Sequence, residues 1–166
     1  MAQIFIAHSS KDKPLIDWIA GNLRAIGITP YQAGYDSPSE TSLQDKLRRE
    51  ISRSQAVFLI LTRNVTGSMN TSTIIQWEFD TAKEKKKPVY VFKEKKVRVP
   101  LMIQLSADYG TFDPVSKESL IEAMNKMVSI GNRLKTREEQ YRAMLVKSFG
   151  ALAETVFLVL RSERDS

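Results

Sequence analysis

Apolar and polar positions along the chain form short blocks that switch between a strand-like and a helix-like period. Apolar runs typical of buried strands occupy residues 3–7, 28–31, 56–61, 89–92 and 107–112. Between these runs the apolar positions recur every three or four residues, which is the spacing of one helix face. Strands that alternate with helices predict an α/β fold, in which helices cover both faces of a mostly parallel sheet.

The predicted helices have start and stop signals. Asp12 can cap the first helix, Pro14 stands in its first turn, and Gly27 ends it. The segments 32–41 and 62–70 are expected to be loops, and the first of them is long for a simple connection. Further helices are expected over residues 43–51, 71–86, 116–130 and 137–161, with Gly131 separating the last two.

The last predicted helix is apolar nearly all round where Phe157, Leu158 and Val159 follow one another. Such a helix is usually buried on more than one side. We therefore divide the chain into a domain over residues 1–130 and a C-terminal helical extension over residues 131–166. The extension is expected to pack on the domain or on a second copy of the chain, and the spacing leaves both arrangements open.

Composition places this chain of 166 residues among ordinary globular proteins, since 42% of the residues are hydrophobic and 27% are charged. The absence of cysteine excludes a disulfide framework, a thiolate metal site and a cysteine nucleophile. The amino terminus lacks a basic segment followed by a long apolar one, so no signal peptide is expected. The apolar run at residues 151–160 is too short to span the bilayer, which takes about 20 residues. A cytoplasmic location without membrane contact is expected.

Lys and Arg number 25 against 19 Asp and Glu, so the formal net charge is +6, which favours anionic partners in general. Much of the excess lies in residues 83–87 and 93–98, and glutamates interrupt both runs. We interpret these runs as a solvated helix end and loop rather than as a nucleic-acid patch.

The chain lacks residues that several enzyme classes require. The spacing of the seven glycines matches neither the dinucleotide fingerprint nor the phosphate-cradling G-x-x-x-x-G-K loop. His8 is the only histidine, which argues against a histidine metal site and leaves a Ser-His-Asp triad without its G-x-S-x-G turn. The chain also lacks the acidic residues of a phospho-receiver after its first and third strands. No metal site is expected.

One carboxylate stands out near the predicted ligand edge of the sheet. In an open parallel sheet, ligands bind at the carboxyl ends of the strands, where the segments 7–12, 32–42 and 62–70 would converge. Glu78 lies along the apolar stripe of the following helix, and its neighbours three and four positions away include no cation. Glu78 must find a partner elsewhere or serve a ligand. A glutamate at the stripe edge that tilts to solvent is an equally acceptable interpretation.

Three phrases occur in a fixed order along the chain. Residues 4–12 read I-F-I-A-H-S-S-K-D, residues 51–62 begin I-S-R-S and continue as an apolar run, and residues 76–79 read Q-W-E-F and are followed by Ala82 and Lys87-Pro88-Val89. Together they resemble the TIR (Toll/interleukin-1 receptor) domain, particularly the small microbial kind found in Thoeris-type anti-phage defence. The first phrase is similar to the family's F-I-S-H-S-x-x-D phrase, the second to the start of its central strand, and the third to its W-E-x-x-x-A helix and the next strand. The chain departs from the pattern at Ile74, where members often have tryptophan, and at Pro38-Ser39, where they often have Pro-Gly.

The resemblance implies a flavodoxin-like sheet of five parallel strands and an enzyme that cleaves NAD to nicotinamide and ADP-ribose or a cyclic isomer. NAD is then a substrate, and no cofactor is expected. Glu78 matches the family's catalytic glutamate. Assembly through the second loop and the C-terminal helix, and a TIR or downstream effector partner, are implied too. The substrate-binding residues implied by the resemblance are Phe5, Ser9, Ser10, Asp12, Gly34, Asp36 and Trp77.

The resemblance also admits a catalytically inactive TIR adaptor that acts through protein–protein assembly. The environment of Glu78 distinguishes the two hypotheses. Burial of Glu78 away from basic side chains favours the enzyme, whereas pairing with a surface lysine favours the adaptor.

Overall fold

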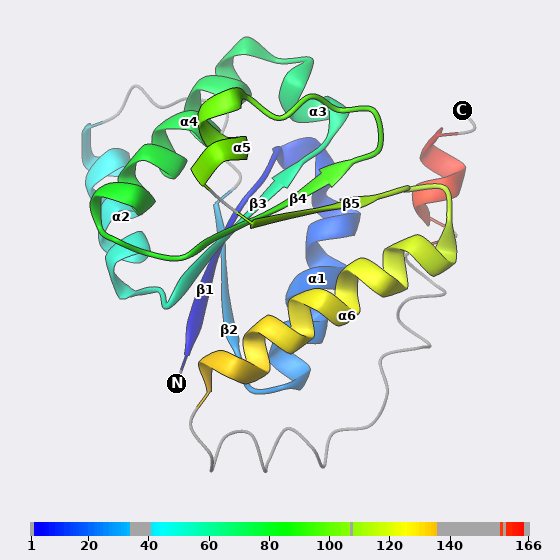
Figure 1. Ribbon diagram of the computed structural model, residues 1–166, viewed down its shortest axis with the longest axis horizontal. Coiled ribbons are helices and arrows are strands. Elements are labelled where there is room, and N and C mark those ends of the chain that lie inside the picture. The colour runs from blue at the N-terminus through cyan, green and yellow to red at the C-terminus, as the bar shows by residue number, and fades with distance from the viewer. Residues whose placement is uncertain (1, 34–40, 107, 136–156, 158, 165–166) are drawn as a thin grey trace.

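The computed structural model describes residues 2–33, 41–106, 108–135, 157 and 159–164. Its centre is a sheet of five parallel strands in the order β2-β1-β3-β4-β5 (Figure 1). This arrangement confirms the predicted α/β class and the flavodoxin-like sheet. The strands are β1 (Gln3–Ala7), β2 (Thr29–Ala33), β3 (Ala56–Leu61), β4 (Val89–Glu94) and β5 (Asp108–Phe112).

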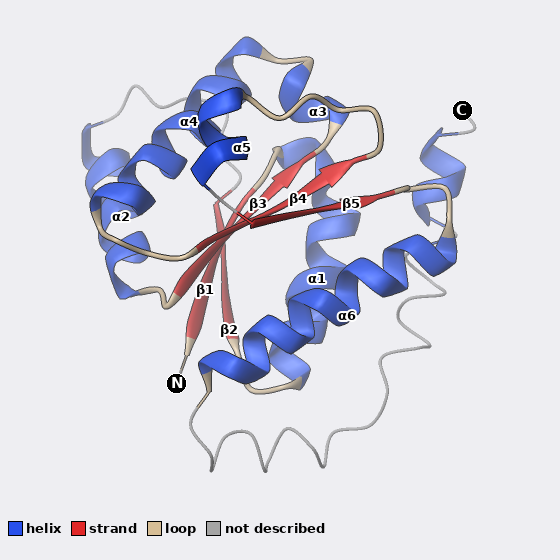
Figure 2. Cartoon of the chain, in the orientation of Figure 1, coloured by secondary structure: helices blue, strands red, loops and turns tan. Residues whose placement is uncertain are grey.

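Helices cover both faces of the sheet (Figure 2). A short 3-10 turn, η1 (Ser10–Asp12), leads from β1 into α1 (Lys13–Ala25), which lies with α6 (Lys117–Leu134) on one face. The other face carries α2 (Thr41–Arg53), α3 (Arg63–Thr66), α4 (Met69–Glu84) and α5 (Leu101–Ser106). Among the described helices, none has the length and apolar character needed to cross a bilayer.

The alternation of side chains along each strand divides the interior into two cores. Ile4 and Ile6 of β1 point into the core beneath α1 and α6, whereas Phe5 and Ala7 point into the core beneath α2 and α4. Strand β3 is buried at all six positions, as expected for the centre of a parallel sheet. Residues on one strand therefore belong to two different environments, and Phe5 shares its side of the sheet with α4.

The expected end of a helix at Ile130 and the separating role of Gly131 are wrong, because α6 continues through Gly131 to Leu134. A Cβ at Gly131 would lie 3.0 Å from Cδ1 of Ile26, so the glycine lets α6 pack closely against the end of α1. Tertiary contact has here overridden the usual helix-stopping tendency of glycine. The expected loop 62–70 is also partly helical, since α3 and the start of α4 lie within it.

Most of the predicted last helix lies outside the described residues. Residues 159–164 are helical, and Leu160 is buried in the core that α1 and α6 share. Arg164 forms a 2.8 Å ion pair with Glu94 at the end of β4. The described end of the chain therefore packs on the sheet domain.

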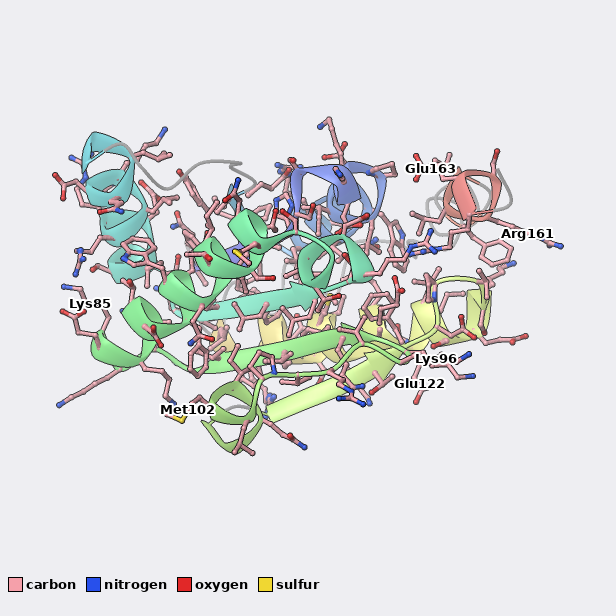
Figure 3. The ribbon with its side chains drawn as sticks, turned by 90° about the horizontal axis from the view of Figure 1, so that it is seen from above. Lys85, Lys96, Met102, Glu122, Arg161 and Glu163 are labelled. Atoms are coloured by element: carbon pink, nitrogen blue, oxygen red, sulfur yellow. The ribbon has the colours of Figure 1, made fainter. Side chains whose placement is uncertain are left out.

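The two basic runs do not form one surface. Lys85 lies near one end of the long axis of the molecule, and Lys96 lies in the other half (Figure 3).

Candidate active site

The strand order reverses between β1 and β3, because the chain goes from β1 to β2 on one side and then crosses to β3 on the other. Ligands of open α/β sheets bind at the carboxyl ends of the strands beside such a reversal. Two described segments reach this place: residues 8–12 after β1 and residues 62–66 after β3. They contain the predicted site residues Ser9, Ser10 and Asp12.

Asp12 joins these two segments. Oγ1 of Thr62 donates a 2.5 Å hydrogen bond to Oδ2 of Asp12, and Nδ2 of Asn64 donates a 2.7 Å bond to Oδ1. Thr62 also caps α3 by accepting a bond from the backbone N–H of Asn64. Asp12 is buried and has both carboxylate oxygens bound by the protein. Its geometry is that of a brace between two loops.

His8 and Ser9 are buried beside this brace, whereas Ser10 is exposed. Oγ of Ser9 caps η1 by accepting a bond from the N–H of Lys11. Nδ1 of His8 lies 2.8 Å from the carbonyl oxygen of Ser9, a contact that assigns the proton to Nδ1. Nε2 of His8 has no hydrogen-bond partner among the described residues. Burial lowers the pKa of His8.

Glu78 is completely buried, at 0% exposure, on the sheet-facing side of α4. Its flanking residues Ile75, Phe79 and Ala82 belong to the core beneath α2 and α4. Neither carboxyl oxygen has a hydrogen-bond partner in the part of the chain that the structure describes. Burial raises the pKa of Glu78 well above its usual value. The interpretation of Glu78 as a solvent-tilted residue is therefore wrong.

Two predicted aromatic site residues lie on the same side of the sheet as Glu78. Phe5 is fully buried and stacks on Tyr31, with 5.4 Å between ring centroids. Trp77 is half-buried against the same core, and the Arg48 guanidinium lies 5.6 Å from its ring centroid. Trp77 of α4 thus packs against α2.

Gly34 and Asp36 lie outside the described residues. Sequence reasoning missed Thr62 and Asn64 as residues of this site. Their only local signal is that Thr62 stands where it can cap a helix, two residues before Asn64. That signal predicts a cap but not a bond to a carboxylate 50 residues earlier.

The arrangement suits the stabilisation of a cation. A carboxyl group in apolar surroundings interacts strongly with a nearby positive charge, because little solvent screens the pair. Strongly perturbed ionisable groups in such surroundings are typical of functional sites. Among the described residues, no three His, Cys, Asp or Glu side chains gather into a potential metal site.

Comparison with known families matches residues 4–128 to the family described as TIR domain. No curated protein matches the sequence. Solved structures share the fold, and three of them illustrate its range. The CMP N-glycosidase BcmB of Clostridium botulinum has 13% identity, a TM-score of 0.54, and coverage of 74% of this chain and 98% of its own. A 2-deoxyribosyltransferase from Bacillus psychrosaccharolyticus has 18% identity, a TM-score of 0.53, and coverage of 75% and 91%. A diflavin flavoprotein from Nostoc sp. has 13% identity, a TM-score of 0.56, and coverage of 80% and 92%.

Proposed function

Because the chain belongs to the TIR-domain family, whose match spans residues 4–128, we propose that it cleaves the N-glycosidic bond of NAD with Glu78 as the catalytic carboxylate. The observation that carries the proposal is the state of Glu78, which is fully buried with both oxygens unpartnered among the described residues. Burying a polar group without a hydrogen bond costs stability. A ligand that uses this carboxylate would account for the cost.

The chemistry needs only one carboxylate. When the bond between the ribose C1′ and the nicotinamide nitrogen breaks, the electron pair goes to the nitrogen and nicotinamide leaves as a neutral molecule. The sugar becomes an oxocarbenium-like cation, which an adjacent carboxylate stabilises, as in glycosidases. Water then adds to C1′ and loses a proton to give ADP-ribose. Attack by a nucleophile of the same molecule gives a cyclic isomer instead.

The positive charge of the substrate would favour the ionised form of Glu78. Burial favours the neutral carboxylic acid in the empty site, since the pKa of Glu78 is raised. The nicotinamide ring of NAD is a cation, and a cation close to a carboxyl group lowers the pKa of that group. Binding of NAD would therefore be coupled to the loss of a proton from Glu78.

Access to Glu78 requires movement, because no part of the residue is exposed. We propose that assembly through the second loop and the C-terminal helix opens the site. We also propose that the product acts on a downstream effector in anti-phage defence in the cytoplasm.

The fold itself is compatible with glycosidic chemistry, because an N-glycosidase and a deoxyribosyltransferase share it.

The test is nicotinamide release from NAD, measured by chromatography over a series of protein concentrations with and without a crowding agent. We compare the wild type with Glu78→Gln, which keeps the size of the side chain, and with Asp80→Asn as a matched control. Asp80 is an exposed carboxylate on the same helix. We expect release by the wild type and Asp80→Asn, and no release by Glu78→Gln.

The product peak then distinguishes ADP-ribose from a cyclic isomer. Equal turnover by Glu78→Gln would overturn the catalytic role of Glu78. No turnover by the folded wild type at any concentration would favour the alternative, a catalytically inactive TIR adaptor that acts through assembly.

A further inference from the structure

A cavity of about 260 Å³ lies on the face of the sheet opposite Glu78, between the edge strand β5 and helix α6. It exists because Gly110 stands where β5 would otherwise carry a side chain. Gly110 is the register partner of Phe92, and a Cβ at Gly110 would lie 3.7 Å from Nζ of Lys126 and 3.9 Å from Cδ1 of Phe92. Glycine weakens a strand and often marks a place where a ligand comes close to the backbone.

The floor of the cavity is aromatic and held in place. Tyr90 and Phe92 stand two residues apart on β4, so both face α6. Both contact the ring of Phe58 edge to face, with ring centroids 6.0 Å apart for Tyr90 and 5.3 Å apart for Phe92. Such contacts fix the planes of the two rings. Ile130 of α6 adds a buried apolar wall. An apolar ligand in the cavity would therefore meet side chains that the core already holds in place.

The rim of the cavity is basic. Lys126, Ser129 and Arg133 lie on one stripe of α6, at the spacing that brings residues three, four and seven apart onto one face. Neither Lys126 nor Arg133 forms an ion pair with any described residue, and the described side chains that line the cavity include no acidic one. Two cations that have no ion pair in the described part of the chain, placed above an aromatic floor, complement a ligand that is both planar and anionic.

We propose that this groove is a second binding site, separate from that of Glu78, for a planar aromatic anion no larger than a mononucleotide. The volume lies just below the range of about 300–1,000 Å³ of ordinary ligand pockets, which suits a ligand no larger than a mononucleotide. The ring lies on Tyr90 and Phe92, and the anionic group meets Lys126 and Arg133. The anion is either a phosphate, as in a nucleotide, or a carboxylate, as in an aromatic acid.

The test is titration of the full chain, followed by the NMR amide signals of Gly110 and Ser129. The probes are adenosine 5′-monophosphate and 4-hydroxybenzoate, with adenosine and inorganic phosphate as controls that each lack one half of the chemistry. We expect saturable shifts with at least one aromatic anion, and roughly tenfold weaker binding of adenosine, the size of effect that one charged hydrogen bond produces. The stronger of the two probes identifies phosphate or carboxylate as the anion.

Variants separate the groove from other sites. Lys126→Gln and Arg133→Gln should each weaken binding of the anion roughly tenfold, whereas Lys95→Gln, which removes an exposed charge elsewhere, should not. Gly110→Val fills the groove with a residue that favours strands, so we expect it to abolish binding while the melting temperature stays the same or rises. Glu78→Gln should leave binding in the groove unchanged, which keeps this proposal independent of NAD cleavage.

Four results would overturn the proposal. They are the absence of saturable shifts with either aromatic anion, equal binding by Gly110→Val, equal binding of inorganic phosphate alone, and shifts at Gly110 and Ser129 that depend on protein concentration without any probe. The last result would assign the groove to a second copy of the chain.

Discussion

Thr62 donates a 2.5 Å hydrogen bond to Asp12, and this bond ties the loop after β1 to the loop after β3, where the strand order reverses. Asn64 binds the other oxygen of the same carboxylate at 2.7 Å. The two loops border the place where ligands of such sheets bind. Because both of its oxygens are bound by the second loop, the buried Asp12 side chain sets the spacing between the two loops. Asp12 thus holds the two loops together, and its contact with substrate stays a prediction.

Asp12→Ala should destabilise the fold, because it leaves the buried hydroxyl of Thr62 and the amide of Asn64 without their acceptor. We expect the free energy of unfolding to fall by about 1–3 kcal/mol, measured by urea denaturation. Thr62→Ser, which keeps the hydroxyl, is the matched control and should lose less. An Asp12→Ala protein as stable as the wild type would show that the brace contributes nothing.

Glu78→Met should make the protein more stable while it abolishes nicotinamide release. The substitution replaces a buried, unpartnered carboxyl with an apolar side chain of similar length, so the desolvation cost of the carboxyl disappears. We expect the free energy of unfolding to rise by about 1 kcal/mol or more. Such opposite effects on stability and activity are typical of functional groups held in unfavourable surroundings.

The control for this comparison is Asp80→Asn on the exposed side of α4, which should change stability by less than about 0.5 kcal/mol. If Glu78→Met were clearly less stable than the wild type, Glu78 would have a stabilising partner, and the main support for its catalytic role would be lost.

The strands were predictable because their signal is local. Strand β3 has the predicted bounds, since its six consecutive apolar residues suit burial on both faces. The course of α6 was not predictable in the same way. Gly131 is a helix-stop signal by itself, and only the proximity of Ile26 on another helix explains why the helix continues.

The candidate site was predictable in part. The helical period placed Glu78 beside an apolar stripe, but a residue at the edge of a stripe can turn inward or outward, and the packing of α2 and α4 decides which. The bond between Asp12 and Thr62 joins segments 50 residues apart, and no pattern in a single sequence pairs them. The roles of all the predicted site residues stay predictions, and Gly34 and Asp36 lie outside the described residues.

The stability of the protein should fall as pH rises above the ordinary pKa of glutamate, about 4.5, because of Glu78. The raised pKa means that the native state still binds a proton after the unfolded chain has released it, so the stabilising contribution is complete below 4.5 and is lost as pH rises toward the native pKa. The slope reaches about 1.4 kcal/mol per pH unit at most.

Urea denaturation of the wild type and Glu78→Gln at a series of pH values isolates this contribution, since glutamine has no proton to lose. The free energy of unfolding of the wild type minus that of Glu78→Gln should fall as pH rises. Parallel profiles would mean that Glu78 titrates with its usual pKa.

His8 should show the opposite dependence. Its pKa is lowered from the ordinary value of 6.5, chiefly by burial, so the unfolded chain takes up a proton that the native state resists. Its contribution to stability is therefore present above pH 6.5 and is lost as pH falls toward the native pKa. Because His8 is the only histidine, a ¹H–¹³C spectrum contains one imidazole to follow. We expect its titration midpoint below 6.5. We also expect the free energy of unfolding of His8→Asn to fall less steeply than that of the wild type as pH drops below 6.5. A midpoint at or above 6.5 would show that the hydrogen bond to the Ser9 carbonyl, together with the negative charge of Asp12, outweighs burial, since both act to raise this pKa.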